Sequence, residues 1–262
     1  MIGHQPRRRF GQNFLVDAGY IAQIIAAVAP NPDDIVVEIG PGLGALTAPL
    51  LGLVRVLHAV EIDRDLAARL SVQYPGDRLL LHQGDALTFD FETLGTNLRV
   101  VGNLPYNISS PVLFRMAEFA GSLRDCHFML QKEVVERMVA APGSKSYGRL
   151  SIMLQYRFHA ESLLTVPAGA FRPAPKVESA LVRLTPHRVP PSSAADERLL
   201  GEMVARAFSQ RRKTVRNALA DFATAEQLWS LGIDPRLRPE NLALDQFVRL
   251  ANAVTARGRS GR

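Results

Sequence analysis

The sequence of 262 residues is poor in cysteine and histidine, with one cysteine and six histidines. The single thiol, Cys126, has no second cysteine for an internal disulfide, and the scattered histidines complete no cysteine-rich zinc module, so no metal site is expected. Long apolar runs are also missing: none reaches the roughly 18 residues of a membrane span. No hydrophobic stretch follows the basic start, as it would in a secretory signal. We therefore expect a cytoplasmic protein without membrane association.

Charge is distributed unevenly along the chain, whose net charge is +6. Residues 1–10 carry three arginines and no acid, and residues 187–262 carry 13 basic and 8 acidic groups. Residues 11–186 are nearly neutral, with 15 basic and 17 acidic groups. Because opposite charge attracts and holds nucleic acid, basic ends around a neutral middle favour a polyanionic partner. A solubilising surface with a loose tail is the alternative.

Short apolar runs alternate with helical spacing through the middle of the chain. The pattern predicts strands at 35–39, 54–61, 79–82, 98–102 and 127–131, and helices at 44–53, 64–73 and 111–119. Repeated β-α-β units indicate an α/β fold with a mostly parallel, Rossmann-like sheet. Such sheets bind ligands at the carboxyl ends of their strands, so we expect the site just after the first four strands.

A segment rich in Pro, Ser and Ala at 186–196 marks the clearest break in the chain. Beyond it, apolar residues follow helical spacing without strand-like alternation. The sequence therefore predicts an α/β domain over residues 1–187, which holds the site, and a small all-α domain over residues 188–262.

A glycine-rich loop, Gly40-Pro41-Gly42-Leu43-Gly44, follows the first predicted strand, and Glu61 ends the second. Glycines let the backbone approach a ligand closely, and an acid about 20 residues further on suits a ribose diol. Pro41 lacks an N–H that a pyrophosphate would use, which favours a nucleoside-type ligand without phosphate. Asp85, after the third strand, can accept the exocyclic amine of an adenine. A structural turn is the alternative for the loop alone; together these positions resemble the S-adenosylmethionine site of class I methyltransferases.

The fourth predicted strand ends in Asn103-Leu104-Pro105-Tyr106. The exocyclic amine of a base is a weak nucleophile because its lone pair is delocalised into the ring. Methyl transfer to this amine therefore needs hydrogen-bond acceptors for its N–H groups rather than a strong base. The Asn103 side-chain oxygen and the Leu104 carbonyl, which Pro105 keeps out of a strand ladder, can accept its N–H groups, while Tyr106 stacks on the ring. We therefore expect Asn103, Leu104, Pro105 and Tyr106 to form the acceptor site.

The N-terminal arm has a physical interpretation of its own. Gln12 and Asn13 can hydrogen-bond the amino-acid end of a cofactor, while Phe14 and Leu15 anchor the arm. The three arginines before them, Arg7, Arg8 and Arg9, are expected to contact phosphate. An arm that frays is the alternative.

Two later segments are further candidates for contact with a nucleic acid. Prolines at 173 and 175 stiffen the loop after Phe171 and favour a projecting ring, although a core aromatic is the alternative. No acid occurs from 203 to 220, which favours phosphate contacts over a solvated face. The cations expected to contact phosphate there are Arg211, Arg212, Lys213 and Arg216.

Six blocks, spread over nearly the whole chain, carry a family resemblance. They are Arg9-Phe10-Gly11-Gln12-Asn13-Phe14-Leu15, Glu38 to Thr47, Gly102 to Ser109, Gln131-Lys132-Glu133-Val134, Phe171 to Ser179 and Arg211-Arg212-Lys213-Thr214. Together they resemble the KsgA (RsmA) family of small-subunit rRNA adenine dimethyltransferases.

The resemblance implies two successive methyl transfers from S-adenosylmethionine to N6 of each of two adjacent adenosines near the 3′ end of 16S rRNA, during late assembly of the small ribosomal subunit. It implies that the helical domain binds rRNA and that Phe171 stacks as a second aromatic ring on a flipped adenine. With no sequence signal for an oligomer, we expect a monomer. The implied cofactor contacts are Asn13, Leu15, Gly40, Glu61, Asp85 and Asn103.

Three other functions compete with this interpretation. A 23S rRNA adenine methyltransferase of the macrolide-resistance type typically has Gly-Lys-Gly and Asn-Ile-Pro-Tyr where this chain has Gly42-Leu43-Gly44 and Asn103-Leu104-Pro105-Tyr106. A DNA adenine methyltransferase would carry an Asp-Pro-Pro-Tyr-like motif and a larger base-reading domain. A non-catalytic assembly factor predicts decay of the cofactor or acceptor motif, and neither motif is decayed.

Overall fold

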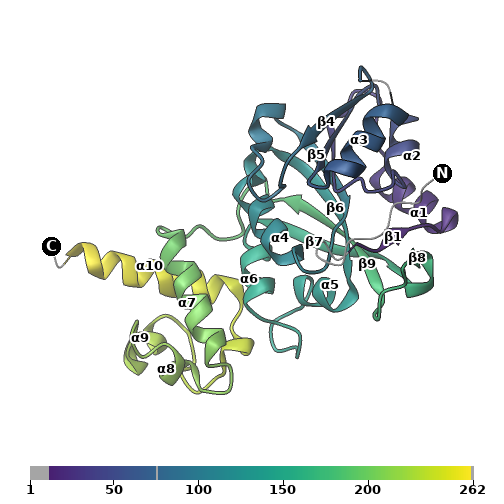
Figure 1. The fold of residues 1–262 in the computed structure, drawn as a ribbon. Coiled ribbons are helices and arrows are strands. Elements are labelled where there is room, and N and C mark those ends of the chain that lie inside the picture. The colour runs from purple at the N-terminus through teal and green to yellow at the C-terminus, as the bar shows by residue number, and fades with distance from the viewer. Residues whose placement is uncertain (1–11, 75, 261–262) are drawn as a thin grey trace. The chain divides into compact units, whose positions relative to one another are not determined.

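The chain folds into two compact units in a computed structural model that describes residues 12–74 and 76–260 (Figure 1). The first unit contains the described residues up to Val135 together with His159–Pro186. The second contains Glu136–Phe158 and the described residues from His187 onward. The chain therefore enters the second unit twice.

The double entry differs from the division expected between residues 187 and 188. A crossing does lie there, but residues 136–158 pack in the second unit instead of the first domain. Tyr147 and Ile152 belong to the same buried apolar cluster as Leu200 and Val204, which lie beyond the second crossing. A long-range packing contact of this kind leaves no break in the local sequence, so composition alone does not indicate it.

A seven-stranded sheet forms the centre of the first unit, and its strand order is β4-β3-β2-β5-β6-β9-β7. Four neighbouring pairs, from β4 to β6, are parallel, and β9 runs antiparallel to β6. The strands are β2 Val36–Ile39, β3 Leu57–Glu61, β4 Leu79–Gln83, β5 Leu98–Asn103, β6 Leu123–Gln131, β7 Phe158–Val166 and β9 Ser179–Pro186. The mostly parallel α/β sheet predicted from the sequence is confirmed, while β7 and β9 are additional strands that the pattern did not predict.

The helices α2, α3 and α4 connect parallel strands, as the alternating pattern predicted. Aspartates cap two helices of the first unit: Asp17 at α1 accepts the N–H groups of Gly19 and Tyr20, and Asp63 at α3 accepts that of Asp65. The helices are α1 Ala18–Val28, α2 Thr47–Leu51, α3 Arg64–Gln73, α4 Ser109–Glu118, α5 Lys132–Met138 and α6 Arg149–Gln155, with short 3-10 turns at Phe91–Leu94, Ala120–Ser122 and Ala168–Ala170.

A two-stranded ribbon lies beside the main sheet and fixes the N-terminal arm (Figure 1). Its strands are β1 Phe14–Leu15 and β8 Phe171–Arg172, paired antiparallel with Phe14 opposite Arg172 and Leu15 opposite Phe171. The pairing continues in a hydrogen bond of 2.9 Å from the Val16 N–H to the Ala170 carbonyl. Two sequence blocks about 150 residues apart are therefore joined by backbone hydrogen bonds.

From His187 onward, the described residues of the second unit form helices and turns but no strand, as predicted for the C-terminal part of the chain. Beyond α6 it contains α7 Glu197–Ser209, α8 Val215–Ala218, α9 Ala225–Ser230, α10 Leu244–Ser260 and a 3-10 turn at Pro239–Asn241. Its core includes Leu200, Met203, Val215, Leu228 and Phe247, all fully buried. Among the residues that the structure describes, no helix of either unit has the length and apolar character needed to cross a membrane.

Candidate active site

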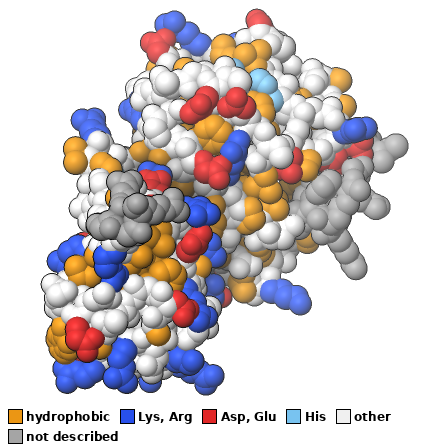
Figure 2. Space-filling view, turned by 90° about the vertical axis from the view of Figure 1, so that its left-hand side faces the viewer, with side chains coloured by type: hydrophobic (Ala, Val, Ile, Leu, Met, Phe, Trp, Pro, Cys, Tyr) orange, Lys and Arg blue, Asp and Glu red, His pale blue; other side chains and the backbone are white. Residues whose placement is uncertain are grey.

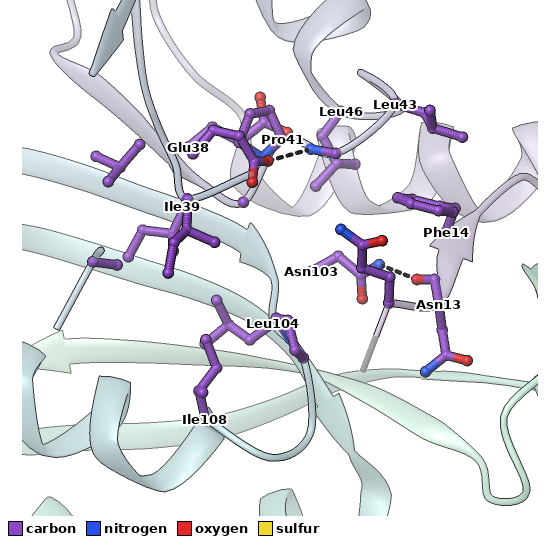
Figure 3. A pocket seen from close by; sticks show the side chains of 18 of the residues that line it. Asn13, Phe14, Glu38, Ile39, Pro41, Leu43, Leu46, Asn103, Leu104 and Ile108 are labelled. Atoms are coloured by element: carbon purple, nitrogen blue, oxygen red, sulfur yellow. Dashed lines mark hydrogen bonds between the residues drawn. The ribbon is translucent and has the colours of Figure 1, made fainter. Parts of the chain in front are cut away.

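A pocket opens in the first unit at the carboxyl ends of β2, β3, β4 and β5 (Figure 3). The segments that line it are 12–15, 38–43, 45–46, 60–62, 84–87 and 103–108. Its position is the one that the strand order predicted, because parallel strands end together at one edge of the sheet. The pocket brings together all six expected cofactor contacts and the four residues of the acceptor motif.

The glycine loop needs glycine for conformational reasons at this pocket. Gly42 has a φ of +59°, and a Cβ there would lie 3.1 Å from the Phe14 ring, so a larger residue is both strained and crowded. Gly102 shows a second close approach, since a Cβ on it would lie 2.7 Å from the Ile39 carbonyl oxygen. The ends of β2 and β5 are thereby held together, with the glycine loop beside Asn103.

Glu61 is a buried carboxylate, 4% exposed, at the end of β3. Its Oε2 accepts the Gly42 N–H at 3.1 Å, and its Oε1 accepts the Asp63 N–H at 2.9 Å. Burial raises the pKa of Glu61, while the backbone N–H groups of Asp63 and Gly42 act in the opposite direction. The side chain therefore ties the glycine loop to β3 and presents a carboxyl group to the pocket.

Glu38 is a second buried carboxyl group of the pocket, 2% exposed, which the sequence analysis did not assign a role. The Thr47 hydroxyl donates to its Oε2 at 2.6 Å. Burial raises the pKa of Glu38 to about 7; the Thr47 hydrogen bond opposes this rise and the charge of Glu61 adds to it. A charged residue within the apolar strand Val36–Ile39 was the signal that could have identified it.

Asp85 lies just after β4, where its carboxylate turns the chain. Its Oδ1 accepts the Leu87 N–H at 2.9 Å, and its carbonyl accepts the Thr88 N–H at 3.0 Å. This local turn directs the 84–87 segment along the pocket wall. The adenine contact expected of Asp85 stays a prediction.

Asn103 is joined to the N-terminal arm by its side chain (Figure 3). Its Nδ2 donates to the main-chain carbonyl of Asn13 at 2.9 Å. Because the NH₂ end of the amide is used in this way, the other end, Oδ1, is left as an acceptor. The arm thus sets which end of the Asn103 amide is available for an acceptor role.

Tyr106 is joined to the start of β9 by a hydrogen bond between its hydroxyl and the Ser179 Oγ, at 2.8 Å. Ser179 is fully buried, and burial also raises the pKa of the Tyr106 hydroxyl. This contact fixes the outer end of the Tyr106 ring. Ser179 was not predicted as a site residue. It lies 73 positions from Tyr106 in the sequence, and a contact between such distant residues leaves no local pattern.

Phe171 is placed differently from the expectation of a projecting ring. It is 1% exposed, belongs to the hydrophobic core of the first unit and is not among the pocket-lining residues. Its backbone pairs with Leu15 across the β1–β8 ribbon, and that pairing directs the ring into the core beside Leu15. The core aromatic, the alternative to a projecting ring, is the position observed, and the aromatic ring that does line the pocket from this ribbon is Phe14.

The expected RNA-binding cations have different environments. Arg7, Arg8 and Arg9 lie outside the described residues. Arg211 forms an ion pair with Glu240 and donates to the Lys145 carbonyl at 2.6 Å, so its guanidinium holds the second unit together. Arg212, Lys213 and Arg216 are exposed. The first three of the four C-terminal cations lie in the turn between α7 and α8 rather than on one helix, because Thr214 has an extended backbone.

The fold and this pocket define a class I methyltransferase, and comparisons with known proteins agree. The family model described as ribosomal RNA adenine dimethylase matches residues 3–256. The chain therefore belongs to the ribosomal RNA adenine dimethylase family, and the resemblance noted in the sequence is confirmed.

Individual proteins that the chain resembles also methylate RNA according to their names. A protein of Chromobacterium violaceum named ribosomal RNA small subunit methyltransferase A is 57% identical over 262 residues, covering 100% of both chains. The crystal structure of a dimethyladenosine transferase from Plasmodium falciparum has a TM-score of 0.79 and 25% identity, covering 94% of this chain and 98% of that one. The 23S rRNA methyltransferase ErmE has a TM-score of 0.74 and 26% identity, covering 93% and 100%. The small-subunit relative is thus far more similar in sequence than the 23S enzyme.

Proposed function

We propose that the chain uses S-adenosylmethionine to dimethylate N6 of two adjacent adenosines near the 3′ end of 16S rRNA, during late assembly of the small ribosomal subunit in the cytoplasm. The observation that carries the proposal is that the glycine loop and the Asn103–Tyr106 motif line one pocket. The 57% identity to a protein named ribosomal RNA small subunit methyltransferase A supports the choice of rRNA.

The residues that line the pocket fit S-adenosylmethionine. Gly40 has a positive φ and no atom within 4 Å of where a Cβ would lie, which leaves room for a ligand against the backbone of the loop. The buried carboxyl group of Glu61, which lines the pocket at the end of β3, suits the ribose hydroxyls of such a ligand. The residues that would hold the cofactor are Asn13, Leu15, Gly40, Glu61, Asp85 and Asn103, and the bound cofactor would supply an electrophilic methyl group.

The acceptor motif would orient the adenine amine. Asn103 Oδ1, left as an acceptor by the bond to Asn13, accepts one N6–H, and the Leu104 carbonyl accepts the other. Two acceptors on the N–H groups turn the nitrogen lone pair out of conjugation and toward the methyl donor, and the proton released on methylation leaves to solvent. Pro105 shapes the turn that exposes the carbonyl, and the Tyr106 ring, fixed through Ser179, stacks on the base.

Two basic regions of the chain would bind the phosphates of the RNA substrate. The N-terminal arginines Arg7, Arg8 and Arg9 precede the arm that reaches the site, and Arg212, Lys213 and Arg216 are exposed on the second unit. Arg211 contributes less, because Glu240 already neutralises it. Contacts of this kind bind phosphate without reading sequence.

The test is incubation of the protein with radiolabelled S-adenosylmethionine and undermethylated small ribosomal subunits, followed by mapping of the modified bases. We expect label at N6 of two adjacent adenosines near the 3′ end of 16S rRNA, and none in large subunits offered as the control. Label in 23S rRNA alone would assign the chain to the competing rRNA function. Absence of any label with folded, cofactor-binding protein would favour a non-catalytic factor.

A further inference from the structure

Trp229 is the only tryptophan of the sequence, and it lies exposed on α9 of the second unit. Its side chain is 53% exposed. The neighbouring Leu228 of the same short helix is completely buried and packs in the core, whereas Trp229 faces outward. Trp is enriched at interfaces because its ring combines an apolar face with a polar N–H, which makes the position a candidate contact surface.

One arginine is already placed over this ring. The Arg236 guanidinium carbon lies 5.6 Å from the centre of the Trp229 ring. Arg236 is held there by Asp234, whose Oδ1 accepts from Nε at 3.0 Å and whose Oδ2 accepts from Nη2 at 2.9 Å. A cation thus lies over one side of the ring, and this cation is paired with a carboxylate.

The basic turn before α8 lies against the segment that carries Arg236. The Arg216 N–H donates to the Pro235 carbonyl at 3.1 Å, and the Val215 N–H donates to the Leu237 carbonyl at 2.7 Å. Residues 211–216 and 235–238 together carry six cations and no acid. Figure 2 shows Lys and Arg side chains along the lower edge of the second unit, where α8 and α9 lie.

Four of these six cations have no carboxylate to neutralise them. Arg211 pairs with Glu240 and Arg236 pairs with Asp234. Within the part of the chain that the structure describes, no ion pair involves the remaining four, which are all exposed: Arg212, Lys213, Arg216 and Arg238. The segment that carries Arg236 over the ring therefore also carries Arg238, one of these four, and it is hydrogen-bonded to the start of α8, directly after the turn that holds Arg212 and Lys213.

We propose that Trp229 is a stacking platform for an unpaired RNA base, and that Arg212, Lys213, Arg216 and Arg238 hold the phosphates next to that base. The inference rests on the proposed rRNA function and adds a second contact, outside the pocket, to it. An exposed ring in the same unit as four exposed cations, linked to them through the 235–238 segment, matches a nucleotide better than an apolar protein surface, because a nucleotide offers both a π-face and a phosphate. A duplex offers its phosphates but keeps its bases stacked, so an unpaired nucleotide is the fitting partner.

Because the chain has one tryptophan, its fluorescence reports on this ring alone. The probe is a short single-stranded RNA of mixed sequence, with a blunt duplex of the same sequence as the control. We expect the single strand to quench the emission of the intact protein and the duplex to quench it much less, with an affinity that falls as salt is raised. Unchanged emission at RNA concentrations that saturate binding, as followed by anisotropy of labelled RNA, would overturn the proposal.

Substitutions separate stacking from simple burial. Trp229→Leu should weaken binding of the single strand about 5- to 150-fold, which corresponds to the loss of one base–aromatic stack. Trp229→Phe should recover most of that loss. Val72→Ser, which changes a side chain that is 91% exposed in the first unit, is the matched control and should have no effect. Equal binding by the wild type and Trp229→Leu would contradict the platform.

Arg212→Gln combined with Lys213→Gln should weaken RNA binding and reduce its salt dependence by nearly one unit of slope for each phosphate that the protein no longer neutralises. The quenching by saturating RNA should persist in this variant, since the ring is still present. An unchanged slope would show that these cations do not bind phosphate and would overturn that part of the proposal.

Methylation of undermethylated small subunits distinguishes this inference from the proposed function. If the wild type methylates them and Trp229→Leu does so with the same KM for subunits, the platform is wrong and the function stands. If Trp229→Leu weakens subunit binding but not that of free single-stranded RNA, the ring contacts a protein and the RNA platform is again wrong. If the wild type does not methylate any rRNA, the proposed function itself has failed.

Discussion

The cofactor half and the acceptor half of the pocket are built in different ways. In the cofactor half, the Glu61 carboxylate is held by backbone N–H groups of its own strand end and of the adjacent glycine loop, 19 positions away. In the acceptor half, Asn103 is held by a carbonyl 90 positions away and Tyr106 by a hydroxyl 73 positions away. The cofactor half therefore follows from local β-α connections, whereas the acceptor half depends on the docking of distant segments.

Asn103→Ala should separate the two halves most strongly. We expect methylation to fall on the order of a hundred- to a thousandfold, because the missing acceptor acts mainly in the transition state. Binding of S-adenosylmethionine should change by less than about tenfold, since the ground state depends on the glycine loop and Glu61. Calorimetry and single-turnover rates measure both quantities, and an equal loss in the two would refute the assignment of Asn103 to the acceptor half.

Glu38 gives the cofactor half a pH-dependent stability. Its folded pKa of about 7 lies above its ordinary value of 4.5, so its stabilising contribution is present below about pH 4.5 and is lost as pH rises through about 7. Glu38→Gln cannot ionise, and its stability relative to the wild type should rise over this window by roughly 3 kcal/mol, at about 1.4 kcal/mol per pKa unit. Urea unfolding of both proteins at the two ends of the window measures the difference, which a parallel pH dependence would contradict.

Glu61→Ala should weaken cofactor binding more than it lowers the methylation rate, whereas Asn103→Ala should do the reverse. We expect S-adenosylmethionine binding to weaken by about 1.5 to 3 kcal/mol, the range for a hydrogen bond to a charged group. The methylation rate at saturating cofactor should change much less. Because the Gly42 and Asp63 N–H groups lose their acceptor in this variant, its thermal unfolding is measured as a control. An unchanged cofactor affinity in the folded variant would show that Glu61 does not bind the cofactor.

Ser179→Ala should have the smallest effect on catalysis of the four variants, and it tests whether the acceptor half depends on a distant residue. Loss of one hydrogen bond to Tyr106, about 1 kcal/mol, should lower kcat/KM for subunits about fivefold without changing cofactor affinity. Tyr106→Phe removes the same bond from the other side, and the double variant should be no worse than either single one. Additive losses would show that Ser179 does not act through Tyr106.

The sequence predicted the local features of the molecule better than the distant ones. The strands β2 to β6 and the pocket at their carboxyl ends follow from repeated β-α-β units, which are legible over short distances. β7 and β9 were missed because neither belongs to such a unit, and the half-exposed β7 lacks a clear alternation. The core position of Phe171 depends on pairing with Leu15, more than 150 residues earlier, which no local pattern encodes.

The double entry of the chain into the second unit has a consequence for how the protein would come apart. A protease cut within residues 188–196 would sever one of the covalent links between the units but not remove the second unit, because residues 136–158 remain attached to the first and packed in the helical core. The two fragments should therefore co-purify until a denaturant separates them. A gene cut at the same place would yield two incomplete pieces: a larger one exposing Tyr147, Ile152 and Tyr156, and a helical one lacking the side chains that fill its core.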